Sequence, residues 1–211
     1  SEPGSGARSA VRSCRSGTSG PCIRRSAGKS IYTIDELAVH VYSVHMVAPT
    51  DKKILIAARR VLEQGGVEAV SMRPVAKAIG LTAMAIYRHY PDRQALLDAV
   101  AAEGFNELVG WLGRRRFTGD AETRLMKVLD VFVQFGLAHP ELFELMFLTK
   151  HTSARRFPTD FKARRSPTAN LAVETIKEGM QRGEFRQDDP WEVMFEFGAM
   201  AQGFVMLYFG G

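Results

Sequence analysis

Residues 70–100 read VSMRPVAKAIGLTAMAIYRHYPDRQALLDAV, and the order of apolar and turn residues in this stretch decides the fold. Helix-forming residues run from Met72 to Ile79 and from Ala83 to Tyr90, with Gly80 between the two runs. Glycine readily adopts the backbone conformation that ends a helix, and Pro91 disfavours helical geometry at the residue before it. The stretch therefore predicts two short helices joined by a tight turn, with a further helix after the proline.

Helical spacing of apolar residues continues on both sides of this stretch. One more helix is predicted over residues 51–64, ended by Gly65-Gly66, and a long one over 93–112 that would span about 30 Å. Four others are predicted over 120–137, 140–147, 166–181 and 191–208, and no segment predicts a strand. Polar residues that favour helix starts precede the predicted helices: Thr50, Ser71, Thr82, Asp92, Asp120, Ser166 and Asp189. The segment 149–165 is expected to be a long basic loop.

These elements predict an all-α protein with two parts. Residues 49–100 form an N-terminal three-helix helix-turn-helix module, in which the second helix of the pair enters the DNA major groove. The long helix after it joins this module to a second α-helical domain over residues 101–211. Residues 1–30 are rich in Ser, Gly and Arg, and few apolar side chains are available there to offset the entropy of ordering them. Residues 31–45 could form a short helix or strand, but they are isolated in the sequence, and the whole segment 1–48 is expected to be a disordered tail.

The sequence also supports hypotheses about this N-terminal segment. Compact helical patterning begins just after Met46, so Met46 is the natural start in one hypothesis and the residues before it are upstream sequence. Cys14 and Cys22 lie outside any CxxC pair, and we expect them to be free thiols in a reducing compartment. Deleting residues 1–45 is expected to leave both folding and DNA sequence preference unchanged.

Charge and composition narrow the function classes. The chain has 28 Lys and Arg against 23 Asp and Glu, a net charge of +5 that favours polyanionic partners without identifying one. No apolar run reaches the roughly 18 residues that cross a bilayer, so no membrane association and a cytoplasmic location are expected. His139 and His151 lack metal-ligand spacing, and no catalytic constellation is present. We therefore expect neither an enzyme nor a bound metal or cofactor.

The predicted helix over 83–90 has the side chains that a major-groove helix needs. Ala83 and Ala85 are small enough for close approach, and Ile86 is expected to point into the core. Polar or contacting groups remain on the other surface, and Leu81 and Tyr90 are expected to pack within the module. Arg88 is the candidate for a bidentate base or phosphate contact, Tyr87 and His89 for phosphate oxygens, and Thr82 or Met84 for a base edge or thymine methyl.

This stretch resembles the DNA-binding segment of the TetR family of bacterial regulators over about fifty residues in register. The resemblance lies at Ser71, Gly80, Tyr87, Arg88-His89, Tyr90, Pro91 and Arg93. It implies that Tyr87 and Arg93 anchor phosphates and that residues 82–84 and Arg88 help to read sequence. The full predicted set of DNA-contacting residues is Ser71, Arg73, Thr82, Ala83, Met84, Tyr87, Arg88, His89 and Arg93.

The second half resembles the ligand-binding and dimerisation half of the family in architecture alone, at His139-Pro140-Glu141-Leu142-Phe143 and around Gly183-Glu184-Phe185. The resemblance implies a homodimer that binds a pseudo-palindromic double-stranded operator and is released by a small-molecule effector. Large apolar residues are candidates for the effector pocket, although each alone is more often core: Phe105, Trp111, Phe132, Phe135, Met146, Phe147, Met180, Met194 and Phe197.

Two alternatives to this interpretation stay open at the sequence level. A helical carrier of apolar small molecules would show no specific DNA binding, and a helical enzyme would need a polar set that these residues do not supply. Family members usually carry nine or more helices, and only eight are predicted here. We therefore expect that a final helix is missing and that the chain either dimerises weakly or exposes an unusually apolar surface.

Overall fold

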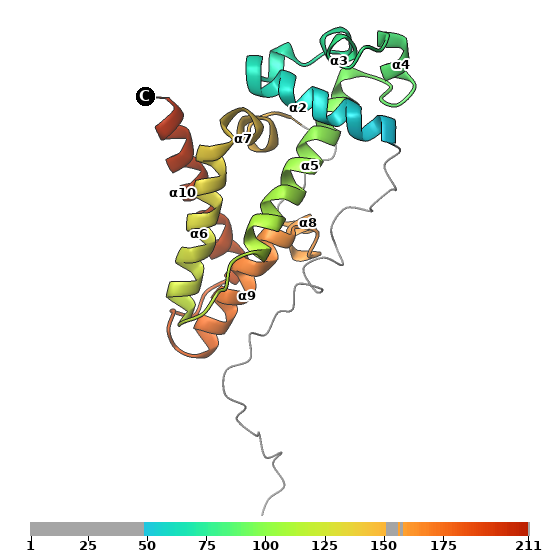
Figure 1. Cartoon of the computed structure of the whole chain (residues 1–211). Helices are drawn as coiled ribbons and strands as arrows, with labels where there is room; N and C mark the ends of the chain where they lie inside the picture. The colour runs from blue at the N-terminus through green and yellow to red at the C-terminus, as the bar shows by residue number, and fades with distance from the viewer. Residues whose placement is uncertain (1–48, 151–155, 157, 211) are drawn as a thin grey trace, which may run out of the picture.

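A computed structural model describes residues 49–150, 156 and 158–210. Within these ranges every regular element is a helix, in agreement with the all-α prediction (Figure 1). The elements are α2 (Pro49–Ala69), α3 (Met72–Ala78), α4 (Ala83–Tyr87), α5 (Arg93–Gly113), α6 (Ala121–Ala138), α7 (Pro140–Phe147), α8 (Thr159–Lys162), α9 (Pro167–Gln181) and α10 (Pro190–Phe209). The expected disorder of residues 1–48, the thiols of Cys14 and Cys22 and the role of Met46 lie outside the described residues.

Helices α2, α3 and α4 form the helix-turn-helix module at one end of the molecule (Figure 1). Its core is built from the apolar stripe of α2 and single residues of the two short helices, and Ile54, Ala58, Leu62, Val75 and Ile86 are each fully buried. Gly80 has φ +68° and turns the chain between α3 and α4, as its position in the sequence predicts. The predicted three-helix module is therefore confirmed.

The helix boundaries differ from the predictions in three places. Helix α2 continues through Gly65 and kinks at Gly66, where φ +70° and ψ −173° interrupt the helical ladder, before one last turn. Helix α4 ends at Tyr87, because the backbone N–H groups of His89 and Tyr90 both donate to the carbonyl oxygen of Ile86 and tighten the chain into a turn. The predicted basic loop contains the short helix α8.

Helix capping follows the sequence at some starts and departs from it at others. The side chains of Thr82, Asp92, Asp120 and Asp189 each accept a backbone N–H bond at the start of a helix, as predicted. Ser71 and Ser166 occupy N-cap positions without a side-chain capping bond. Thr50 lies inside α2, because the helix begins one residue earlier; the prediction that Thr50 caps it is wrong.

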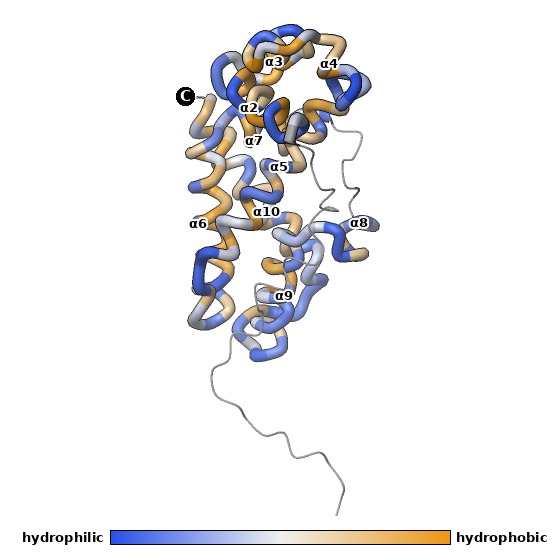
Figure 2. Tube along the Cα trace, turned by 45° about the vertical axis from the view of Figure 1, so that its right-hand side comes forward, coloured by the Kyte–Doolittle hydropathy of each residue, from blue (hydrophilic) through white to orange (hydrophobic). Residues whose placement is uncertain are grey.

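Helix α5 links the module to a bundle formed with α6, α7, α9 and α10 (Figure 1). The centre of this bundle holds Phe135 and Phe143, both fully buried, and the hydrophobic residues along α6 and α10 are visible in Figure 2. Gly136 allows α6 and α10 to approach closely, since a Cβ at this position would lie 2.8 Å from Cγ1 of Val205. Among the described helices none combines the length and the hydropathy required to span a membrane.

Candidate DNA-reading face and ligand cavity

Helix α4 buries one side chain and presents the others outward. Ile86 is fully buried, whereas Met84 is 71% exposed and Tyr87 48% exposed. Thr82 has its hydroxyl oxygen engaged by the Ala85 N–H at 3.2 Å, which leaves the hydroxyl hydrogen as a donor. Leu81 is 38% exposed, so the prediction that it packs inside the module is wrong: the Gly80 turn directs it to the surface.

The other predicted DNA-contacting residues gather around this helix. Arg73 in α3 is exposed, as is Arg88 immediately after α4, while Ser71 and Ala83 are partly buried. These residues lie on the short helices α3 and α4 or beside them, at the end of the molecule distant from α9 (Figure 1). The arrangement places hydrogen-bond donors and the apolar side chain of Met84 on one exposed surface, which suits contacts with phosphates and base edges.

Besides Thr82, two members of the predicted set make side-chain contacts within the protein. Nδ1 of His89 contacts Oδ1 of Asp51, in the first turn of α2. Arg93 donates from Nε to the Val70 carbonyl and from Nη2 to the Val67 carbonyl, each at 2.7 Å. Arg93 thereby ties the start of α5 to the chain that leads from α2 into α3, and it is placed to position the module.

Tyr90 and Glu103 lie near this module and carry shifted pKa values. Burial raises the pKa of the Tyr90 hydroxyl to about 12, with smaller contributions from the carboxylates of Asp51 and Glu103. Partial burial also raises the pKa of Glu103, and the positive charges of Arg59 and Lys52 partly offset this rise. Tyr90 is partly buried and packs against the core, as its sequence position predicts.

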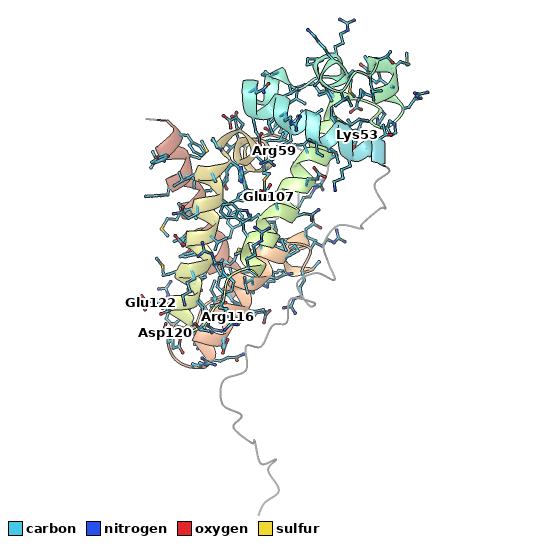
Figure 3. All side chains as sticks on the ribbon, viewed as in Figure 1. Lys53, Arg59, Glu107, Arg116, Asp120 and Glu122 are labelled. Carbon is cyan, nitrogen blue, oxygen red and sulfur yellow. The ribbon has the colours of Figure 1, made fainter. Side chains whose placement is uncertain are left out.

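An ion-pair network connects the module to the bundle. Arg59 of α2 donates from Nη1 to Oε2 of Glu107 at 3.3 Å, and its Nη2 lies 3.2 Å from Nδ1 of His139 (Figure 3). A guanidinium group has only donors, so Nδ1 of His139 is the acceptor and Nε2 carries the hydrogen. That Nε2 lies 3.2 Å from Oε1 of Glu107. The three side chains join α2, α5 and the residue that precedes α7.

A cavity of about 390 Å³ lies within the bundle. Helices α5, α6, α7, α9 and α10 all contribute to its wall, and Phe161 of α8 closes part of it. The lining is mostly apolar, and its hydrogen-bonding side chains are Asp98, Thr149, Ser166, Thr168 and Gln202. Ligand cavities in proteins are commonly apolar enclosures of this size with a few polar groups that orient the ligand.

The structure brings six of the nine predicted pocket residues to this cavity: Phe105, Phe132, Met146, Phe147, Met194 and Phe197. Trp111, Phe135 and Met180 lie outside the lining. Trp111 packs edge-on against Phe135 with ring centroids 5.6 Å apart, and Phe135 and Met180 are buried core residues. Their large apolar side chains fill the space between helices instead of bounding the cavity.

Sequence reasoning missed several lining residues because they are small, polar or in a predicted loop. On α5 the lining follows one face with helical spacing, at Asp98, Ala101, Ala102, Phe105, Leu108 and Leu112. That stripe could have been found from its i, i+3, i+4 periodicity. Phe161 and Thr149 come from the segment that was predicted to be a loop, and no local pattern places them at the cavity.

Comparison with known proteins agrees with this geometry. Residues 54–100 match the family model of the bacterial regulatory proteins of the tetR family, and residues 125–211 match a tetracyclin repressor-like C-terminal domain. A relative described as the uncharacterized HTH-type transcriptional regulator YobS from Bacillus subtilis is 22% identical over 111 residues, which are 53% of this chain and 58% of YobS. The chain thus matches little more than half the length of that relative.

Solved structures show the same architecture. A protein with unknown function from Rhodococcus sp. RHA1 is 29% identical, with a TM-score of 0.65 over 81% of this chain and 88% of that one. AibR, solved with isovaleryl coenzyme A and operator DNA, is 23% identical, with a TM-score of 0.55 over 72% of this chain and 83% of AibR. The helix-turn-helix module, the helical second half and the two family matches establish that this chain belongs to the TetR family of DNA-binding transcriptional regulators.

Proposed function

We propose that this regulator is a repressor that binds a pseudo-palindromic operator as a homodimer and is released from it by a small-molecule effector. The observation that carries the proposal is the position of α5. Its first residue, Arg93, holds the carbonyl groups of Val67 and Val70 in the module, and the face from Asp98 to Leu112 lines the cavity. One helix therefore contacts both the DNA-binding module and the space where an effector would bind.

The ion-pair network supplies a second connection between the two halves. Arg59 of α2 contacts Glu107 of α5 and His139, and His139 directly precedes α7, whose Met146 and Phe147 line the cavity. An effector that displaces α5 or α7 would shift these contacts and tilt α4. Such coupling typically changes affinity by about 5-fold to 150-fold, provided that the effector binds the two states differently.

The homodimer in this proposal uses an exposed apolar face of α10. Met200, Phe204, Leu207 and Tyr208 are between 60% and 78% exposed, and their spacing of three or four residues places them on one side of the helix. An apolar stripe of this kind on a regulator is typical of a surface covered by another subunit. Two copies of α4 would then read half-sites about one helical turn of DNA apart.

The AibR structure supports the effector part of the proposal, since that related fold was solved with both a small-molecule ligand and operator DNA. The proposal also includes a cytoplasmic location, because a bacterial regulator of transcription must reach the DNA.

The cavity alone would also suit a carrier of apolar molecules, which is the second candidate function. Selection of bound duplexes from a random DNA pool separates the two. The repressor proposal predicts a consensus of two inverted half-sites and binding that weakens steeply with salt. A pool that yields no consensus, from protein that still binds apolar probes in the cavity, would favour the carrier.

A further inference from the structure

A contact between His89 and Asp51 joins the chain just after the DNA-reading helix α4 to the start of α2. Nδ1 of His89 contacts Oδ1 of Asp51, which lies in the first turn of α2. Only the exposed Arg88 separates His89 from the last residue of α4, and the side chain of His89 is itself partly exposed. The pair therefore lies beside the surface that is predicted to meet DNA.

The carboxylate of Asp51 determines which ring nitrogen of His89 carries a hydrogen. Oδ1 of Asp51 is shielded from solvent, and among the described residues it has no hydrogen-bond partner besides this contact with His89. If Nδ1 carried no hydrogen, its lone pair would face the carboxylate oxygen, and a buried acceptor would remain unsatisfied. Nδ1 therefore carries a hydrogen and donates it to Asp51.

This assignment limits what the other ring nitrogen, Nε2, can do. A neutral imidazole has a single N–H group, so Nε2 of neutral His89 would present only a lone pair. A phosphate oxygen is also an acceptor, and the two atoms would repel each other. Protonated His89 has a hydrogen on both nitrogens, so it can donate to Asp51 and to a phosphate at the same time. Within the described part of the chain, no partner occupies Nε2.

The surroundings leave His89 as the group that titrates near neutral pH. The first turn of a helix favours a carboxylate, so Asp51 keeps its negative charge. The pKa of the Tyr90 hydroxyl is about 12, so this group stays protonated. The other charged groups are Glu103 of α5, which acts on the Tyr90 hydroxyl, and Lys52 of α2, which acts on Glu103. Histidine is the side chain whose charge ordinarily changes between about pH 5 and pH 8.

We propose that DNA binding takes up a proton at His89, and that Asp51 is the positioning residue that makes this proton necessary. In the complex, the Nδ1–H of His89 donates to Asp51 and the Nε2–H donates to an oxygen of the DNA backbone. The inference rests on the DNA-binding part of the proposed function, and it depends on neither the effector nor the cavity. The affinity for DNA should therefore fall as the pH rises through the range in which histidine loses its charge.

Fluorescence anisotropy of the full chain tests this with two duplexes, one carrying the selected consensus and one of random sequence at low salt. A phosphate contact carries no sequence information, so the affinity for both duplexes should fall about tenfold from about pH 6 to about pH 8. His89→Gln keeps an amide donor that does not titrate, and its affinity should stay within about twofold over this range. His151→Gln is the matched control, because it removes a histidine outside the helix-turn-helix module, and it should keep the fall.

Asp51→Asn separates a positioning role from a structural one. An asparagine amide can donate to Nδ1, so neutral His89 would then carry its hydrogen on Nε2 and could meet a phosphate without taking up a proton. The fall in affinity over the same pH range should shrink to about threefold or less. An unchanged fall at a uniformly lower affinity would show that Asp51 only stabilises the module, and it would overturn the positioning role.

The proton itself can be counted by isothermal titration with the consensus duplex near neutral pH, in two buffers of different ionisation enthalpy. The wild type should take up as much as about one proton per subunit, and His89→Gln should take up none. Binding without proton uptake, or equal uptake by His89→Gln, would overturn the inference and leave the repressor proposal standing. Failure to select any consensus would overturn the repressor proposal alone, and the random duplex would then decide the role of His89.

Discussion

Arg88 follows directly on α4 and is exposed, which places it among the residues available to DNA. We predict that Arg88→Ala weakens operator binding by about 1 to 3 kcal/mol, with the loss concentrated at one operator position, because a bidentate arginine contact discriminates between bases to that extent. Fluorescence anisotropy against a panel of single-base operator variants measures this.

Arg116→Ala is the control for the loss of one positive charge. Arg116 lies at the end of the molecule opposite the helix-turn-helix module (Figure 3), so its removal should leave operator affinity nearly unchanged. A uniform loss over all operator variants in Arg88→Ala would identify a phosphate contact instead, and a lowered melting midpoint would identify a packing role.

Glu103 makes stability depend on pH. Partial burial raises its pKa in the folded state, so its proton is held more tightly in the folded than in the unfolded chain. The contribution of Glu103 to the stability of the folded protein is fully present below the pKa that Glu103 has in the unfolded chain. It is lost as the pH rises through the higher pKa that Glu103 has in the folded protein. Glu103→Gln should therefore gain stability over the wild type as pH rises from the acidic range toward neutrality. Urea unfolding at several pH values checks this, and a difference that shrinks with rising pH would contradict it.

At the scale of helices, the contact between α6 and α10 depends on Gly136. A Cβ there would lie 2.8 Å from Cγ1 of Val205 and 3.1 Å from Cδ2 of Phe143, and both residues are fully buried. We predict that Gly136→Ala lowers the free energy of unfolding by about 1 to 3 kcal/mol, because a packed core accommodates an extra methyl group only by shifting.

The matched substitution is Gly110→Ala in the interior of α5, where a Cβ would meet no atom within 4 Å. Alanine forms helix better than glycine, so this variant should gain about 0.5 to 1 kcal/mol. Thermal melts of the two variants measure the change in stability of each. Equal changes would show that the close contact between α6 and α10 does not limit the size of the residue at position 136.

The sequence predicts elements better than it predicts their ends and their mutual contacts. Periodicity and capping residues locate α5, α6, α7, α9 and α10, since these depend on local spacing. The end of α4 depends on two N–H groups that share the Ile86 carbonyl, and the wall of the cavity depends on which helices meet. Trp111 and Phe105 carry similar sequence signals, yet only Phe105 reaches the cavity.

At the scale of the whole molecule, the exposed apolar face of α10 predicts self-association. Phe204 is 61% exposed in the middle of that face, and a stable dimer typically buries at least about 1,200 Å² in total. We predict that Phe204→Glu shifts the protein toward monomer, because a charge would be desolvated at the interface. Light scattering over a concentration series measures it, and an unchanged dissociation constant would place the dimer contact elsewhere.

The cavity and the face around α4 have no residue in common, although α5 connects them. In the proposed regulator, substitutions in the cavity wall would therefore alter which effector binds without altering the operator sequence that is read, and substitutions on α4 would do the reverse. Natural variation can accumulate separately on these two surfaces. For the same reason the proposed regulator would be a suitable scaffold for biosensors, in which the residues of the cavity wall are diversified against new effectors while a single reporter promoter is kept.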